Sequence, residues 1–166
     1  MVPVADAAAR YGAGMKIAFA ADHAGVLLKD VLVEDARAAG HSAVDLGGHD
    51  PRAPDDYPDF AILAAAALRD GRAERAVIVC GSGVGVTVAA NKHRGIRAGL
   101  CHDTYSAHQG VEHDEMNVLC LGARIVGSEL AREITRVFLG ARFSGEERHL
   151  RRLATIARLD AKITPF

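Results

Sequence analysis

A cysteine at the start of a glycine-rich turn is the part of this sequence with the clearest chemical potential. Residues 77–92, VIVCGSGVGVTVAANK, pass from β-branched residues to Cys80 and then through alternating glycines into a helical pattern. Such a turn points backbone N–H groups in one direction, and the helix N-terminus adds a positive partial charge. We expect a cradle for a phosphate, or for negative charge that develops during a reaction, with Cys80 as base or nucleophile. The alternative is that Cys80 is a small buried hydrophobe, as we expect of Cys101 and Cys120.

Two nucleotide-binding motifs do not fit this turn. A dinucleotide fingerprint requires a glycine where Val86 stands, and the loop follows a middle strand rather than the first one. The phosphate-binding loop of NTPases requires Gly-Lys followed by Ser or Thr, which is absent here. We therefore expect no nucleotide cofactor.

Histidines and acids gather in two other places. Asp22 and His23 follow the first apolar run, where Asp22 is expected to cap a helix and His23 to hold a hydroxyl and move its proton. Residues 101–117 contain three histidines and four acids, which invites a metal site. Their spacing places the histidines on different helix faces, so we expect no metal. His113 would lie at the ligand edge or at its opposite, depending on where its helix ends.

Near the C-terminus, Arg148 and Arg152 lie one helical turn apart in the stretch GEERHLRRL. Like charges at this spacing repel, and a bound anion such as a phosphate would offset the repulsion. The alternative is a solvated charged helix in which Arg151 pairs with Glu147. The sequence leaves both possibilities open.

Five short apolar runs alternate with longer segments of helical period. The predicted strands are 16–21, 42–46, 75–80, 97–101 and 117–122, and the predicted helices are 26–39, 58–70, 85–91, 104–112, 128–139 and 146–163. Gly40 and Gly71 stand where helix ends favour a left-handed residue. Buried strands joined by crossover helices predict a single-domain α/β fold, a doubly wound, Rossmann-like αβα sandwich with a five-stranded parallel sheet. Ligands of such sheets bind beyond the carboxyl ends of the strands.

The composition excludes several classes of protein. The 166 residues carry a net charge of −1, so no large basic field attracts nucleic acid or an anionic membrane. No apolar run approaches the ~20 residues of a transmembrane helix, and the first residues lack the pattern of a signal peptide. Three widely spaced cysteines do not form a disulfide framework. We expect a cytoplasmic protein with reduced thiols.

Several motifs together resemble the type B ribose-5-phosphate isomerases and the related galactose-6-phosphate isomerase subunits. The motifs are AADHAG, DYPDFA, CGSGVGVTVAANKHRGIRAGLCHDTYSAHQGVEH, NVLCLGARIVG and RHLRR, and they span about residues 15–160. Residues 1–14 precede the pattern and are expected to be a flexible extension to a domain of residues 15–166. The resemblance implies a cofactor-independent enzyme that interconverts an aldose phosphate and a ketose phosphate through an enediolate.

The resemblance also implies roles for particular residues. Cys80 resembles the base that takes the carbon-bound proton, and His113 the acid that opens the sugar ring. The expected enediolate cradle consists of the Ser82 hydroxyl and the amides of Gly81, Ser82, Gly83, Val84 and Gly85. The expected sugar-binding residues are Asp22, His23 and Tyr57, and the expected phosphate clamp is Arg148 and Arg152, with Arg124 and His149 as further contributors.

In this family the site lies between two subunits, so the resemblance implies a homodimer or homotetramer whose C-terminal helix reaches a partner subunit. Some members use a glutamate at the position of Val86, whereas this chain keeps Cys80. The family usually has asparagine where this chain has Asp114, which exchanges an amide donor for an acceptor or a charge. The leading hypothesis is ribose 5-phosphate isomerisation. A tetrose, allose or galactose phosphate as substrate, and a non-catalytic sugar-phosphate binding protein, are the alternatives.

Overall fold

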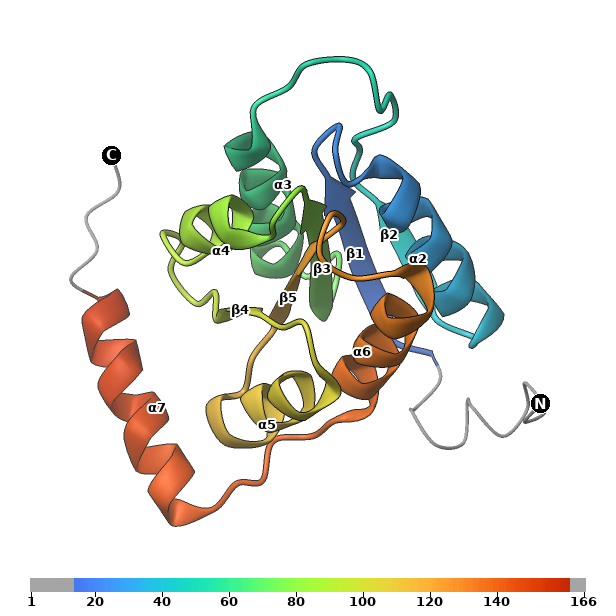
Figure 1. Cartoon of the computed structure of the whole chain (residues 1–166). Coiled ribbons are helices and arrows are strands. Elements are labelled where there is room, and N and C mark those ends of the chain that lie inside the picture. Colours follow the sequence, from blue (N-terminus) through green and yellow to red (C-terminus); the bar gives the residue numbers. More distant parts are fainter. Residues whose placement is uncertain (1–13, 162–166) are drawn as a thin grey trace.

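A five-stranded, entirely parallel sheet forms the centre of the protein (Figure 1), seen in a computed structural model that describes residues 14–161. The strand order is β2-β1-β3-β5-β4. The strands are β1 (Lys16–Ala21), β2 (Ser42–Asp45), β3 (Arg75–Cys80), β4 (Ala98–Leu100) and β5 (Val118–Gly122). The helices are α2 (Val26–Ala38), α3 (Tyr57–Arg69), α4 (Val84–Ala90), α5 (Thr104–Asp114), α6 (Ser128–Gly140) and α7 (Glu147–Asp160). The doubly wound fold and the order of elements predicted from the apolar runs are confirmed.

Helices cover both faces of the sheet and divide the core into two layers. On one face, α2, α5 and α6 pack against the sheet through side chains such as Leu32, Ile134 and Phe138. On the other face, the small residues of α3 and α4 pack against Ile78 and its neighbours. Burying each large apolar side chain contributes about 1.5–3 kcal/mol, so the two layers hold the strand ends in fixed positions.

The two edge strands depart from the prediction of five buried strands. β1, β3 and β5 are almost entirely buried, whereas β2 and β4 consist mainly of partly exposed residues. An edge strand has a neighbour on one side only, so its apolar residues are covered less completely. The apolar runs of these two strands therefore predicted the element correctly and its burial wrongly.

A crevice forms where the chain leaves β1 and β3, because these neighbouring strands lead to helices on opposite faces of the sheet. The close approach of the β1–α2 turn to β3 requires a glycine. A Cβ atom on Gly25 would lie 2.3 Å from the carbonyl oxygen of Val79, which belongs to the backbone of β3. The carboxyl ends of β1 and β3 are thereby brought side by side.

Helix α7 covers neither face of the sheet and stands beside the body of the molecule (Figure 1), with α5 as its main neighbour. It was predicted to begin at Glu146 and to end at Ile163. Glu146 is its N-cap, and Ile163 lies outside the described residues. No helix within residues 14–161 combines the length and the apolar character needed to cross a membrane. Of the predicted extension, residues 1–13 also lie outside the description.

Candidate active site

Cys80 ends β3 with its sulfur against the glycine loop. The Gly83 N–H donates a hydrogen bond to the Cys80 Sγ at 3.0 Å, and Cys80 is only 5% exposed. Gly83 has a φ of +80°, and a Cβ atom there would lie 2.4 Å from Leu100 Cδ1 and 2.9 Å from the backbone carbon of Leu121. Only glycine fits this conformation and this contact, so the residue type fixes the donor at the sulfur.

The remaining N–H groups of the loop divide into occupied and free donors. The Val84 N–H donates to the Ser82 hydroxyl at 3.3 Å, and the Gly83 N–H is taken by the sulfur. Within residues 14–161, the N–H groups of Gly81, Ser82 and Gly85 donate to no protein acceptor. The predicted cradle is therefore narrower than expected, because Gly83 and Val84 already use their donors inside the loop.

Two long side chains lie over the loop. The Arg124 guanidinium is 3.5 Å from the position of a Cβ atom on Gly81, and the backbone N–H of Arg124 donates to the Gly81 carbonyl at 3.0 Å. The Tyr57 ring lies over Gly85, where a Cβ atom would approach it to 2.8 Å. No carboxylate of the described chain pairs with Arg124. The loop thus has an unpaired cation and an aromatic ring at its rim, as the predicted binding roles of Tyr57 and Arg124 require.

Asp22 and His23 also lie at this edge, together with an acid that the sequence analysis did not single out. Asp22 Oδ1 accepts the Gly25 N–H at 3.0 Å, and Gly25, rather than Asp22 as predicted, is the N-cap of α2. Burial raises the pKa of Asp22 above its usual range. The His23 Nδ1 lies 2.7 Å from the Asp55 Oδ1, and this hydrogen bond raises the pKa of His23. The only signal for Asp55 was its position in a loop just before Tyr57.

Asp22, His23 and Asp55 are the one group in the described part of the chain whose ligand atoms, within 4.8 Å of one another, could hold a metal. His23 and Asp55 pair with each other, and Asp22 caps a turn, so each already has a partner. The histidines that invited a metal hypothesis do not converge on one point. His102 accepts the Gly122 N–H, and His108 lies 3.4 Å from Glu112.

The other two cysteines behave as predicted. Both are buried, and burial raises the pKa of Cys101 to about 11 and that of Cys120 to about 12. They remain thiols near neutral pH. Cys80 differs from them because it is the cysteine whose sulfur meets a loop donor.

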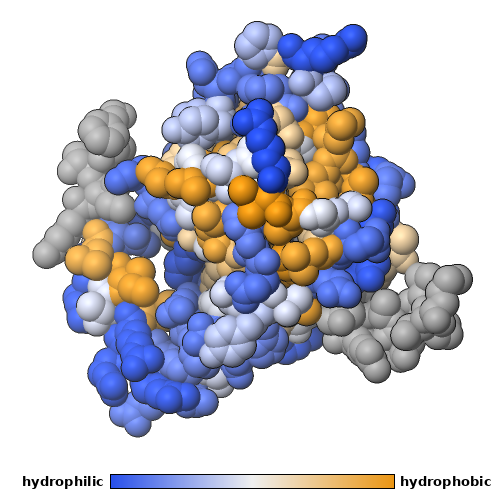
Figure 2. Space-filling model, viewed as in Figure 1, coloured by the Kyte–Doolittle hydropathy of each residue, from blue (hydrophilic) through white to orange (hydrophobic). Residues whose placement is uncertain are grey.

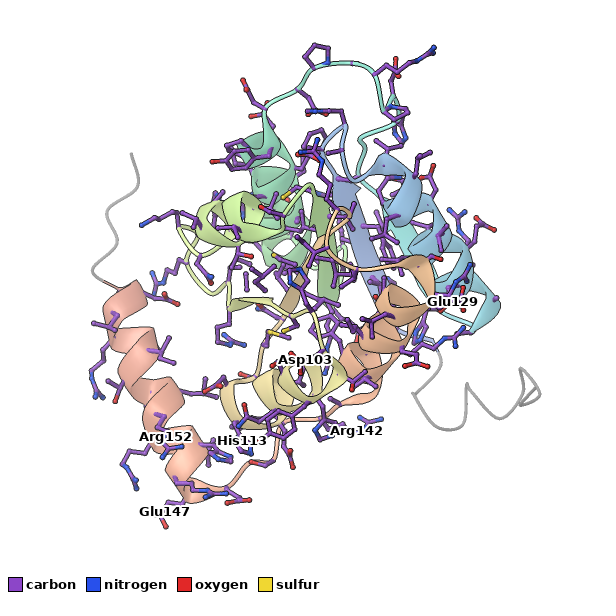
Figure 3. The ribbon with its side chains drawn as sticks, viewed as in Figure 1. Asp103, His113, Glu129, Arg142, Glu147 and Arg152 are labelled. Atoms are coloured by element: carbon purple, nitrogen blue, oxygen red, sulfur yellow. The ribbon has the colours of Figure 1, made fainter. Side chains whose placement is uncertain are left out.

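The second half of the predicted site lies elsewhere in the chain. His113 is in the last turn of α5, five residues before β5 starts and therefore toward the amino ends of the strands. The 11 residues of α5 span about 16 Å, and the helix starts near the carboxyl end of β5. Figure 3 shows His113 close to Arg152 of α7. One chain therefore does not bring His113, Arg148 and Arg152 to Cys80.

Two expectations about α7 need correction: that His149 contacts the phosphate, and that Arg151 pairs with Glu147. His149 is fully buried and its ring stacks on His113 with centroids 4.1 Å apart, so it is not placed to touch a phosphate. Arg148 pairs with Glu146 at 2.8 Å, and no ion pair joins Arg151 to Glu147 in the described structure. Arg152 has no ion-pair partner among residues 14–161 and remains a free cation.

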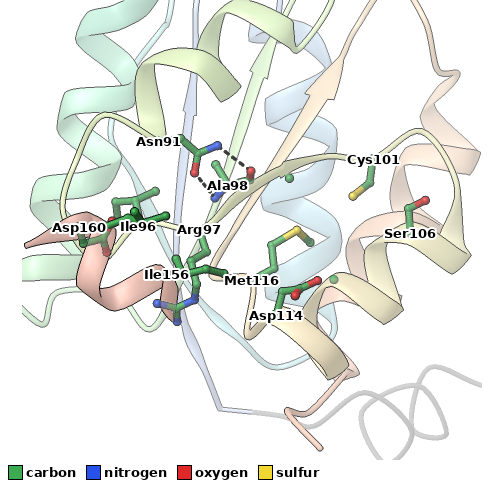
Figure 4. A pocket seen from close by; sticks show the side chains of 13 residues that line it. Asn91, Ile96, Arg97, Ala98, Cys101, Ser106, Asp114, Met116, Ile156 and Asp160 are labelled. Atoms are coloured by element: carbon green, nitrogen blue, oxygen red, sulfur yellow. Dashed lines mark hydrogen bonds between the residues drawn. The ribbon is translucent and has the colours of Figure 1, made fainter. Parts of the chain in front are cut away.

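Beside this group, a cavity of about 470 Å³ opens between α7, α5 and β4 (Figure 4). Asp114 lines it together with Cys101, Met116, Ile156 and Leu159. Figure 2 shows apolar side chains on α7 and over the neighbouring helix α4. The exposed apolar side chains of these two helices include Val84, Val88, Leu150, Ile156 and Leu159.

The fold and the loop define a doubly wound α/β protein whose site combines a thiol, free backbone donors and a cationic rim, which suits acid–base chemistry on an anionic substrate. The model of the ribose/galactose isomerase family matches residues 17–156. The chain belongs to this family and is a sugar-phosphate isomerase.

Relatives agree over almost the whole chain. Ribose-5-phosphate isomerase B of Escherichia coli is 39% identical over 89% of this chain and 97% of its own. The D-erythrulose-4-phosphate isomerase of Pectobacterium atrosepticum is 40% identical over 79% of this chain and 86% of its own. The solved structure of Clostridium thermocellum ribose-5-phosphate isomerase B is 38% identical, covers 90% of this chain and 100% of its own, and has a TM-score of 0.87.

Proposed function

We propose that this enzyme interconverts ribose 5-phosphate and ribulose 5-phosphate. The observation that carries the proposal is the Cys80 sulfur hydrogen-bonded to the Gly83 N–H, next to the free N–H groups of Gly81 and Ser82. A base and an oxyanion cradle on one loop are what proton transfer between adjacent carbons of a carbonyl compound requires. The ribose 5-phosphate isomerase B relatives support this choice of substrate.

In the proposed reaction, His113 donates a proton to the ring oxygen, the bond between C1 and the ring oxygen breaks, and the C1 hydroxyl releases its proton to the solvent, so that the furanose opens to the aldehyde. The Cys80 thiolate then removes the proton from C2, and the electron pair moves into an enediolate. The Gly81 and Ser82 N–H groups stabilise its oxygen, while Asp22, His23 and Tyr57 hold the sugar. The Cys80 thiol returns the proton to C1, a hydroxyl proton moves from O2 to O1, and the ketose forms. Transition-state charge is stabilised by donors already in position, so little reorganisation is needed.

We further propose that two subunits complete each site as a homodimer or as part of a homotetramer. One subunit supplies Cys80 with its loop and Arg124, and the other supplies His113 with the phosphate-binding Arg148 and Arg152. The length of α5 and the position of α7 beside the body support this arrangement, because they carry these groups to the far end of the same chain. The exposed apolar residues of α7 and α4 supply surface for the association.

The presence of Asp114 is a reason to test other sugar phosphates as substrates. A carboxylate accepts hydrogen bonds where the amide of asparagine would also donate one, and the Pectobacterium atrosepticum relative is named for a tetrulose phosphate. Measuring kcat/KM for ribose 5-phosphate, erythrose 4-phosphate, allose 6-phosphate and galactose 6-phosphate decides among them. We expect the highest value for ribose 5-phosphate, and a clearly higher value for another sugar would replace it as substrate.

The Cys80→Ala variant tests the chemistry. Losing a general base lowers kcat by about 10²–10⁴-fold, and we expect binding of the sugar phosphate, followed by calorimetry, to survive. Cys120→Ala is the matched control, since this buried thiol lies outside the site. Normal turnover by Cys80→Ala would remove Cys80 from the mechanism, and an inactive wild-type chain that still binds would indicate the non-catalytic alternative.

Mixing two inactive variants tests the shared site. Cys80→Ala and His113→Ala subunits, unfolded together and refolded at equal amounts, should regain about a quarter of the wild-type activity, because half the dimers are mixed and each has one intact site. If both groups came from one chain, every site would keep a defect. No activity would then return.

A further inference from the structure

The most unusual buried group outside the glycine loop is the imidazole of His149. It lies in the first turn of α7, a helix that is otherwise exposed or only partly covered, yet it is 0% exposed. Its ring is stacked on that of His113, with centroids 4.1 Å apart and planes inclined by 28°. The His113 side chain keeps 30% of its surface exposed. One face of His113 is therefore covered by a second imidazole, while another part stays open to a ligand.

The hydrogen bonds of His149 hold its ring in one orientation. Nδ1 lies 2.6 Å from the Ser144 hydroxyl, which also accepts the Glu146 N–H at 3.2 Å. The Ser144 N–H donates to the carbonyl of Glu112, next to His113, at 2.9 Å. His149 Nε2 is buried without a hydrogen-bond partner in the described structure. A buried polar atom without a partner destabilises the fold. If residue 149 served the fold alone, an apolar side chain would give the greater stability.

The surroundings of His149 favour the neutral form of its ring. Burial lowers the pKa of His149, His113 and Arg148 lower it further, Glu146 raises it, and Arg152 lowers it. On the α5 side, Glu112 lies 3.9 Å from His113 Nε2. The pKa of His149 is therefore lower than that of an ordinary imidazole, which favours the neutral form of its ring.

We infer that His149 is a positioning residue for His113: it stacks beneath the ring of the ring-opening acid, is itself held by Ser144, and sets the orientation of the proton donor. This inference rests on the role of His113 in the proposed function. The stack thereby fixes the position of the His113 ring. A misplacement of about 1 Å in such a group costs up to about 10²-fold in rate.

Three variants separate orientation from folding. His149→Ala removes the stacked ring, and His149→Phe restores an aromatic surface without the hydrogen bond to Ser144. His108→Ala is the matched control, because His108 lies on α5 with His113, is exposed and pairs with Glu112. Circular dichroism verifies that each variant folds.

Two reactions of each variant are compared. Turnover of ribose 5-phosphate requires opening of a furanose ring. Exchange of a C1 hydrogen of ribulose 5-phosphate with deuterium from the solvent does not, because O5 carries the phosphate and this ketose stays open. We expect His149→Ala to lower kcat/KM for ribose 5-phosphate by about tenfold or more, with exchange kept within about twofold of the wild type. His149→Phe should recover most of the loss, and His108→Ala should match the wild type.

Wild-type kcat/KM for His149→Ala, or an equal fall in both reactions, would overturn the inference. Imidazole NMR provides a readout independent of turnover. In the wild type we expect a ring-current shift on the His113 Cε1 proton that disappears in His149→Ala and returns in His149→Phe. Absence of that shift would also overturn the inference. A wild-type chain inactive on ribose 5-phosphate but with the expected shift contradicts the proposed function alone.

Discussion

Replacing Gly83 by alanine tests whether the glycine loop holds its donors by close packing. The left-handed backbone at Gly83 costs an L-residue about 1–2 kcal/mol. The added methyl would lie 2.4 Å from Leu100 Cδ1, which is able to move, but also 2.9 Å from the backbone carbon of Leu121, which is part of β5. Overpacking of this kind costs about 1–3 kcal/mol. The expected total loss in the free energy of unfolding is therefore about 2–5 kcal/mol.

Gly71→Ala is the matched control for the backbone term. Gly71 also has a left-handed backbone, with φ of +69°, but nothing lies within 4 Å of its Cβ position. Its replacement should cost only about 1–2 kcal/mol. Urea unfolding of both variants at one protein concentration measures the difference, since subunit association also stabilises the folded state.

Activity supplies the second measurement. If the loop shifts to admit the methyl, the Gly83 N–H moves away from the Cys80 sulfur, so kcat should fall in Gly83→Ala and stay normal in Gly71→Ala. Equal losses of stability in the two variants, together with normal turnover in both, would refute the reasoning that close packing fixes the loop.

Two further predictions concern titration. Asp55→Asn should lower the pKa of His23 toward its ordinary value, because the hydrogen bond to the carboxylate raises it. His23 then loses its charge at a lower pH, so KM for the sugar phosphate should rise. A proton NMR titration of His23 that matches the wild type would contradict this prediction. Burial lowers the pKa of His41, so the unfolded chain binds a proton more readily than the folded one, and stability should fall as the pH drops below about 6.5. His41→Leu should reduce that fall in urea midpoints measured between pH 7.5 and 5.5, and an unchanged pH dependence would show that His41 is not its source.

The parts of the protein that local pattern controls were predictable from the sequence. Apolar runs and helical periods placed every strand and helix within a few residues, and the glycine spacing identified the loop around Cys80. Parallel topology then placed Asp22 and His23 at the same edge, because strand ends of one direction meet there.

Contacts between distant segments were not predictable in the same way. The Asp55 carboxylate reaches His23 across 32 residues from a loop without periodicity. The burial of His149 depends on how α7 meets α5, whereas the spacing of Arg148 and Arg152 describes only the outer face of that helix. Which donors of the loop are free depends on individual hydrogen bonds that a motif does not specify.

The length of α5 limits how this chain tolerates insertions and deletions. Adding or removing one residue in its 11-residue span would rotate every later side chain by about 100° about the helix axis. His113 would then face away from His149, while β5 would still begin with the same apolar run. Inserting or deleting one residue before His113 in this helix would thus abolish the activity and leave the fold recognisable.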